Sequence, residues 1–405
     1  MKRLLVAFLV VAGAASRGLG QEALLPGTGW GTGIGVAAWG FSKAVAQSGG
    51  GLQGVTQVAV PFRLQVAFGR WTVDLSGAGA AGAALYKQAA SQDSSGEEGD
   101  DMRVVTLYGP TDLKLRFTGP VVGENLLLTV GINLPTGKVG LNSDETIALQ
   151  ALGAPALQMP VGAFGTGAGA TVGAVRAFDG EDWAVALGAS VEQRTEYSPL
   201  ALLLEDGKAE TRIAPGMATH VTLGLDRTLG ENRLSALLAG DVFSRDRVQL
   251  VAPSGAEASK EFQLGPQLAL MTRLDLAASA WRESAISFSA RYRGEFKDSA
   301  RAKTSGSSGT YFEGSIGGVR GGPEGRGFVV GLDGRWHSGL KFTDAMVGAA
   351  ATSIGASLGW EKLGTTTATR FVFHAEYGSF DTGRVKATGY GVTLGMSVGA
   401  RREVQ

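Results

Sequence analysis

The sequence contains no cysteine, which excludes disulfide bonds and thiolate metal sites. Only 18% of its 405 residues are charged, and 37 basic residues balance 37 acidic ones. Because such a chain has no basic surplus to attract phosphate groups, a nucleic-acid partner is not expected. The sequence has only three histidines, so candidates for a metal site or a catalytic base are few.

The amino terminus, MKRLLVAFLVVAGAASRGLGQ, has a basic start, an apolar core over 4–12 and small residues after it. This order is typical of a cleavable secretory signal, and the apolar core is too short to span a membrane. We therefore predict a signal peptide at 1–20 and a single mature domain at 21–405.

One later stretch, from Ile147 to Val175, carries no charge and is long enough for a transmembrane helix. Pro155, Pro160 and several glycines make it a poor helix. It is interpreted as an apolar loop that continues into a strand.

Glycine is abundant instead, with 63 residues spread through the chain. In GYGVTLGMSVGA, at 389–400, each even-numbered residue is apolar and each odd-numbered one is glycine, serine or threonine. The same alternation recurs in 60–68, 126–133, 286–293 and 370–377. A period of two predicts β-strands with one apolar face.

Sixteen such segments occur, most of them longer than the strands of soluble sheets. They lie near 30–46, 55–68, 71–86, 103–117, 124–135, 161–177, 183–196, 212–228, 233–249, 263–276, 283–296, 310–320, 326–338, 348–361, 367–378 and 385–400. Short turns alternate with longer polar loops, which include 87–102, 136–160, 197–211, 250–262 and 297–309. This pattern predicts an all-β, transmembrane up-and-down antiparallel barrel with an even strand number of about 14–16, short periplasmic turns and longer extracellular loops. A β-rich soluble protein is the alternative fold.

In such a barrel the apolar faces meet lipid, and the lipid-facing set includes Leu64, Leu128, Phe288, Phe373 and Leu394. The polar faces line the lumen. The lumen-lining candidates are Arg63, Lys114, Arg116, His220, Arg273, Arg291, Arg293, Arg335, Arg370, His374 and Glu376. Cross-strand ion pairs in a hydrated wall are the simplest explanation of these charges.

The G-x-S-x-G pattern of hydrolases occurs around Ser357 and Ser397. Both serines lie inside alternating strands with no evident base, so no catalytic residue and no enzymatic activity are predicted. The three histidines lack metal-ligand spacing and are expected to be satisfied by neighbouring charges. No dinucleotide fingerprint is present, and no metal or cofactor is predicted.

The long segment from Val139 to Met159 is mostly apolar and would be costly to leave in water as one patch. We expect it to fold into the mouth of the barrel as a constriction. The constriction-loop candidates are Ile147, Leu149, Leu152, Leu157 and Met159.

Two stretches, GPTDLKLRFTGPVVGENLLLTVGINLPTGK at 109–138 and PVGAFGTGAGATVGAVRAF at 160–178, carry a family resemblance. Here the chain resembles outer-membrane barrels of the phenol-degradation (MetA-pathway) type, which are akin to channels for hydrophobic compounds. The resemblance implies passage of small hydrophobic molecules. Its matching residues, Asp112 and 134–137, are expected to serve strand and turn geometry.

Two functions follow as hypotheses. The first is an outer-membrane channel for passive passage of small hydrophobic or amphipathic compounds. The second is a structural or surface-interaction outer-membrane barrel with a filled lumen and no transport. A hydrolase inside the barrel is a third, weaker reading. The partners expected are the lipid bilayer, lipopolysaccharide, the small solute and the outer-membrane assembly machinery.

Overall fold

The computed structural model describes residues 29–47, 50–87, 102–123, 125–204, 207–295, 297–298, 302–303, 308–321, 325–339, 350–381 and 385–400. The predicted signal peptide at 1–20 lies outside the described residues.

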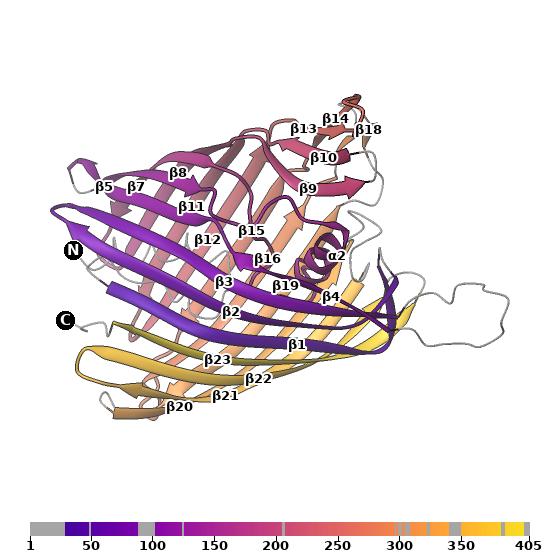
Figure 1. Cartoon of the computed structure of the whole chain (residues 1–405). Helices are drawn as coiled ribbons and strands as arrows, with labels where there is room; N and C mark the ends of the chain where they lie inside the picture. Colours follow the sequence, from indigo (N-terminus) through magenta and orange to yellow (C-terminus); the bar gives the residue numbers. More distant parts are fainter. Residues whose placement is uncertain are drawn as a thin grey trace.

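Long antiparallel strands make up most of the described chain and close into a sixteen-strand barrel, as the alternation predicts (Figure 1). The wall consists of β1 (Gly29–Gln47), β2 (Gly50–Phe68), β3 (Trp71–Lys87), β4 (Met102–Pro110) with β5 (Leu113–Val122), β6 (Leu126–Leu134), β7 (Gly169–Asp179), β8 (Trp183–Arg194), β11 (Ala218–Leu229), β12 (Asn232–Phe243), β15 (Gln267–Asp275), β16 (Glu283–Arg293), β19 (Gly309–Arg320), β20 (Gly325–Ser338), β21 (Ala350–Leu363), β22 (Thr367–Asp381) and β23 (Lys386–Ala400).

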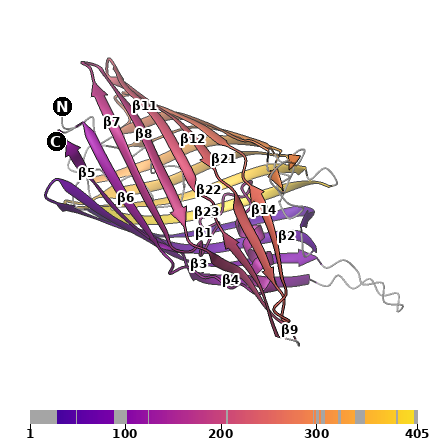
Figure 2. The ribbon, with the colours of Figure 1, turned by 90° about the horizontal axis from the view of Figure 1, so that it is seen from above.

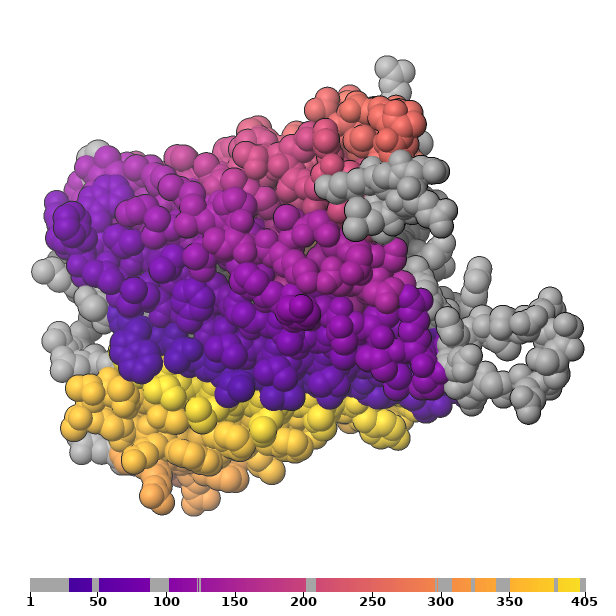
Figure 3. Space-filling view, viewed as in Figure 1, coloured from indigo at the N-terminus to yellow at the C-terminus, as the bar shows by residue number. Residues whose placement is uncertain are grey.

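The first and last strands close the wall. Residues Gly31–Phe41 of β1 pair antiparallel with Gly389–Gly399 of β23. The indigo and yellow strands accordingly lie side by side in the space-filling view (Figure 3). Seen from above, β7, β8 and β11 pass in front of β21–β23, which form the opposite wall (Figure 2). Closure gives each backbone amide in the membrane a partner within the sheet, which lipid does not offer.

The fourth wall position is divided, whereas the sequence predicts one strand at 103–117. Residues Gly79–Lys87 of β3 pair with β4, and residues Thr72–Ser76 pair with β5. Thr111 and Asp112 lie between the two pieces and belong to neither. The reason for the break is that Asp112 turns inward and binds other segments, as described below.

The two faces of the strands differ as predicted. Leu64, Phe288, Phe373 and Leu394 are each more than 40% exposed on the outer face. In β23 the outer face carries Tyr390, Val392, Leu394 and Met396, and the glycines alternate with them on the inner face. A continuous apolar outer surface of this kind is stable only against lipid. The fold is that of an outer-membrane β-barrel.

Several predicted loops are strands that extend the wall beyond the barrel. A second antiparallel sheet is formed by β9 (Tyr197–Leu204), β10 (Gly207–Ala214), β13 (Asp246–Val251), β14 (Glu257–Gln263), β17 (Lys297–Asp298) and β18 (Ala302–Lys303). The predictions of loops at 197–211 and 250–262, and for part of 297–309, were therefore wrong. The polar sequence of β14, EASKEFQ, suits a strand that is solvated on both faces, which composition alone does not distinguish from a loop.

The connection between β6 and β7 also differs from expectation. The strand predicted at 161–177 begins only at Gly169, because the residues before it belong to a segment inside the barrel. That segment contains a helix, α2 (Ser143–Leu152), where a loop was predicted. None of the helices in the described ranges is both long and apolar enough to cross a membrane.

The two faces of β7 allow a direct test with adjacent residues. Val172 is 55% exposed on the outer face, whereas Thr171 faces inward and lies opposite Glu192 of β8. Val172→Arg should lower the free energy of unfolding by about 2–4 kcal/mol, because a guanidinium must enter lipid. Thr171→Arg should be tolerated, because it meets water and a carboxylate. Urea titrations in lipid vesicles measure both, and equal losses would contradict this assignment of the faces.

Candidate functional site in the barrel lumen

A segment that leaves the wall after β6 and returns at β7 lies inside the barrel. Its helix begins with a capping box: the Asn142 side chain accepts from the Glu145 amide at 2.9 Å, and the Glu145 carboxylate accepts from the Asn142 amide at 3.2 Å. The helix ends at Gly153. The N-x-x-E pattern at Asn142 is a sequence signal for the start of a helix. It was not used in the prediction, which rested on the prolines and glycines farther along the segment. We call residues 141–166 the inward segment.

Apolar side chains of the inward segment pack against the inner wall. Leu152, Leu157 and Met159 are at most 7% exposed and belong to one buried cluster with residues of β1–β4. Ile147 and Leu149 are partly buried against the same cluster. A side chain at Gly82 would collide with Leu152, so β3 needs a glycine there. Burial of each large apolar side chain contributes about 1.5–3 kcal/mol.

Polar contacts fix the same segment to three wall strands. The fully buried Gln57 side chain donates to the Val161 carbonyl and accepts from the Val161 amide, both at 2.7 Å. The Trp39 indole donates to the Leu157 carbonyl at 3.1 Å. Across the lumen, the Gln158 amide donates to the Tyr311 hydroxyl of β19 at 2.7 Å. The inward segment therefore touches both sides of the barrel.

Asp112, at the break between β4 and β5, holds both ends of the inward segment. Its buried carboxylate accepts hydrogen bonds from the Gly137 amide (2.8 Å), the Thr166 amide (2.7 Å), the Thr166 hydroxyl (2.9 Å) and the Asn133 side chain (3.0 Å). Of the residues that carry the sequence resemblance, Gly137 binds this carboxylate. The Thr136 hydroxyl donates to the Thr111 carbonyl and accepts from the Leu113 amide on either side of Asp112.

All eleven lumen-lining candidates lie on inward-facing positions. Arg63 binds Asp74, and Arg370 binds Glu361 together with Arg282 near the short-turn end. The others follow the same inward rows of the strand register: Lys114, Arg116, His220, Arg273, Arg291, Arg293, Arg335, His374 and Glu376. Their role as the lining of a pathway stays a prediction.

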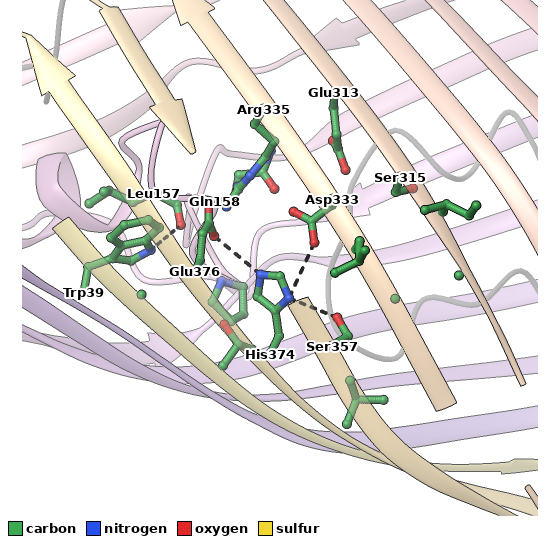
Figure 4. Close-up of a pocket in the computed structure, with 18 residues that line it drawn as sticks. Trp39, Leu157, Gln158, Glu313, Ser315, Asp333, Arg335, Ser357, His374 and Glu376 are labelled. Carbon is green, nitrogen blue, oxygen red and sulfur yellow. Dashed lines mark hydrogen bonds and ion pairs between the residues drawn. The ribbon is translucent and has the colours of Figure 1, made fainter. Parts of the chain in front are cut away.

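Between the inward segment and the opposite wall lies a cavity of about 360 Å³ (Figure 4). Trp39 of β1 lines it together with Leu157, Gln158 and Pro160 of the inward segment. Strands β19–β22 supply its polar side, which consists of Glu313, Ser315, Asp333, Arg335, Ser357, His374 and Glu376. We call this space the lumen cavity.

Strand register explains why these residues meet. One inward row runs Ser315–Asp333–Gly355–Glu376–Gly391–Trp39 across neighbouring strands. The next row runs Gly331–Ser357–His374–Thr393. Sequence analysis missed Trp39, Ser357 and Glu313 as cavity residues, since their assembly depends on pairing between distant segments. The small residues opposite them, such as Gly391, are the signal that was available.

The polar side of the lumen cavity contains one ion pair and one histidine that lies between two carboxylates. Arg335 and Glu376 form a buried ion pair. His374 lies between carboxylates, with its Nε2 3.6 Å from Glu376 and its Nδ1 3.6 Å from Asp333. In the described part of the chain, no group of three or more histidine, aspartate or glutamate side chains is arranged to hold a metal ion.

The histidines differ from the expectation that charges satisfy each of them. His220 does bind Asp241, at 2.7 Å. His337, however, is 4% exposed and its ring contacts the Tyr311 ring at a tilt, and neither ring nitrogen has a hydrogen-bond partner among the described residues. The expectation was therefore wrong for His337, because its neighbours in register are Tyr311 and Ala351 rather than acidic residues.

Ser357 also differs from expectation, because a base lies beside it. The two residues face each other across β21 and β22, and Ser357 Oγ is 3.0 Å from His374 Nδ1. Attack on an ester further requires amide donors for the oxyanion. Here the strand is paired on both edges, with β20 and with β22, so its amides serve the ladder. Ser357 and His374 form a polar pair on the inner face of the wall.

No protein-family model matches the sequence, and no curated protein matches it. Among solved structures, a mutant of the monoaromatic hydrocarbon channel TodX is 9% identical with a TM-score of 0.45, covering 98% of this chain and 100% of that one. The TodX toluene transporter of P. putida is 9% identical, with a TM-score of 0.41 and coverage of 94% and 91%. OpdK of Pseudomonas aeruginosa, solved with vanillate, is 10% identical, with a TM-score of 0.38 and coverage of 91% and 98%. The assignment of the barrel rests on the strand pairing of this chain itself.

The role of Asp112 can be tested by removing its charge. Asp112→Asn puts an amide group among donors, so the free energy of unfolding should fall by about 1.5–3 kcal/mol. Asp144→Asn is the matched control, because Asp144 is half-exposed and its ion pair with Arg103 is worth about 1 kcal/mol or less. Urea titration in lipid vesicles measures both. Similar stabilities for the two variants would contradict a central role for Asp112.

A fluorophosphonate probe tests whether Ser357 acts as a nucleophile. We expect no labelling of the folded protein, because the backbone amides of β21 around Ser357 are engaged in pairing with β20 and β22 rather than free to stabilise the transition state. Mass spectrometry after digestion locates any adduct, and Ser357→Ala is the control. An adduct on Ser357 that His374→Ala abolishes would show a working nucleophile.

Proposed function

We propose that this barrel is an outer-membrane channel for the passive passage of small hydrophobic or amphipathic compounds. The observation that carries the proposal is the lumen cavity, a space of about 360 Å³ inside a closed barrel. Its volume lies near the lower end of the range of about 300–1,000 Å³ for ligand pockets. Apolar and polar side chains share its surface, as in sites that bind small organic molecules.

The inward segment determines which solutes can pass. A sixteen-strand barrel is wide enough for a water-filled channel. Here Trp39, Leu157 and Pro160 put apolar surface along the way. A strongly hydrated inorganic ion or a sugar would lose water against these apolar side chains, whereas the apolar part of a solute loses little. Selectivity for hydrophobic or amphipathic compounds follows from this difference.

The proposal includes the route by which the protein reaches its place. Residues 1–20 are the secretory signal, cleaved on export, and the assembly machinery inserts the remaining chain into the outer membrane. The apolar outer face then lies in the lipid bilayer, with lipopolysaccharide around the second antiparallel sheet. These partners follow from the signal pattern and from the exposed apolar surface of the barrel.

One observation favours a second function, a structural barrel that transports nothing. The two-way contact between Gln57 and Val161, together with the burial of Leu152 and Leu157, fastens the inward segment firmly to the wall. A segment held in this way could fill the lumen permanently. Transport measurements decide between the two functions.

Deletion of residues 146–158 tests the channel directly. The deletion removes most of α2 and the contact of Gln158 with Tyr311, so single-channel ion conductance in planar bilayers should rise severalfold. Uptake of aromatic compounds by cells that produce the protein should lose its selectivity over sugars, because the apolar constriction is gone.

The control is a shorter deletion outside the lumen, residues 252–256, which form the turn between β13 and β14. It should change neither conductance nor uptake. Heat-modifiable gel mobility confirms that each variant keeps its barrel. Unchanged conductance in the 146–158 deletion would show that the inward segment lies outside the pathway. Wild-type protein that neither conducts nor takes up any solute would support the structural barrel.

A further inference from the structure

We infer that the lumen cavity binds the protonated amine of a small amphipathic compound, with the apolar part of that compound against Trp39 and Leu157. The inference rests on the proposed function and specifies its substrate class. Its basis is the arrangement of charge, bare backbone and apolar surface around a single space.

The first observation is the bare backbone between the polar side chains. In the row from Asp333 to Trp39, every second inward position is glycine. A side chain at Gly355 would collide with His374 and come within 3.0 Å of Asp333. A side chain at Gly391 would lie 2.6 Å from the Trp39 ring. The glycines therefore let Asp333, Glu376 and Trp39 face the same space.

The second observation is the balance of charge. The cavity surface carries the three carboxylates of Glu313, Asp333 and Glu376 but a single guanidinium, that of Arg335. Arg335 is paired with Glu376, and the Tyr311 hydroxyl donates to Glu313. Among the side chains that line the cavity, carboxylates therefore outnumber guanidinium groups by three to one. Inside a barrel, such an excess attracts a cation more strongly than it would in water.

Asp333 is the carboxylate best placed to meet that cation. Its partners in register are Ser315 and Gly355, and neither carries a charge. Asp333 Oδ1 lies 3.6 Å from His374 Nδ1, which is longer than a hydrogen bond. Figure 4 shows Asp333 directed toward His374 at the centre of the lining residues. An ammonium group there could donate to Asp333, to Ser357 and to the carbonyl edge of Gln158.

The third observation is the apolar side opposite these groups. Trp39 and Leu157 are joined by the indole hydrogen bond, so the Trp39 ring is held in a fixed position at the cavity. Trp39 also stacks on Phe41 and meets the edge of Phe380, which leaves it little freedom to move. A ring or short alkyl chain fits against this surface while its charged end meets Asp333. An anion in the cavity would be repelled by these carboxylates. A neutral solute would exclude water from Asp333 without supplying a positive charge in its place.

The test compares three probes of similar size by calorimetry on the full chain folded in detergent. The probes are 2-phenylethylamine, which is protonated at neutral pH, 2-phenylethanol and phenylacetate. The amine should bind about tenfold or more tightly than the alcohol, and phenylacetate should not bind detectably. Asp333→Asn should weaken amine binding by about tenfold or more and leave the alcohol unchanged. Asp275→Asn, a lumen carboxylate paired with Arg273 outside the cavity, should leave both unchanged.

The comparison of probes on the wild-type protein stands even where a variant fails to fold. Equal affinities for the amine and the alcohol would overturn the inference. So would an unchanged affinity for the amine in Asp333→Asn. Displacement of the amine by an equal concentration of sodium would also overturn it. Cellular uptake of 2-phenylethanol separates the two proposals. Uptake of the alcohol without preferential amine binding leaves the channel standing and removes the amine site. Amine binding without uptake of either solute keeps the site and removes the channel.

Discussion

A single buried carboxylate, that of Asp112, determines how the lumen of this barrel is filled. It accepts hydrogen bonds from Gly137, near the start of the inward segment, and from Thr166, at its end. Each bond to an ionised acceptor is stronger than a neutral one, and a carboxylate buried without such donors would be costly. The same residue interrupts the fourth strand, so the break in the wall and the position of the inward segment have one cause. The position of Leu157, Gln158 and Pro160 at the lumen cavity therefore depends on this anchor.

The glycine-rich inner face has a physical explanation that joins the fold to the site. The outer residues of β23 meet lipid, and its inner glycines leave room for side chains from neighbouring strands. Phe41 and Phe380 pack over Gly389, and Trp39 packs over Gly391. Large side chains on β1 and β22 are thus matched by bare positions on the strand between them. Beyond these aromatic side chains, the same bare rows leave the lumen cavity open.

Much of this fold could be predicted from the sequence, and most of the site could not. The alternation of apolar and polar residues predicted the sixteen wall strands. Lipid on one face and water on the other require this alternation in each strand separately, so it can be read from each strand's own sequence. The second sheet was missed because solvated strands such as 257–263 lack that contrast between faces. Helix α2 was missed because Pro155 and Pro160 outweighed the capping pattern at Asn142. The pairing of Ser357 with His374 depends on the register between β21 and β22, which no local pattern of a single sequence specifies.

The central claim is that the inward segment is seated in the lumen beside Trp39, and one fluorescence measurement tests it most directly. Because the chain has no cysteine, Gln158→Cys provides a single attachment point for bimane, a dye that tryptophan quenches on contact. Gln158 and Trp39 line the same cavity, so bimane fluorescence should be strongly quenched in protein folded in lipid and recovered by Trp39→Phe. Equal fluorescence with and without Trp39 would mean that the segment does not lie against this wall, and the account would fail.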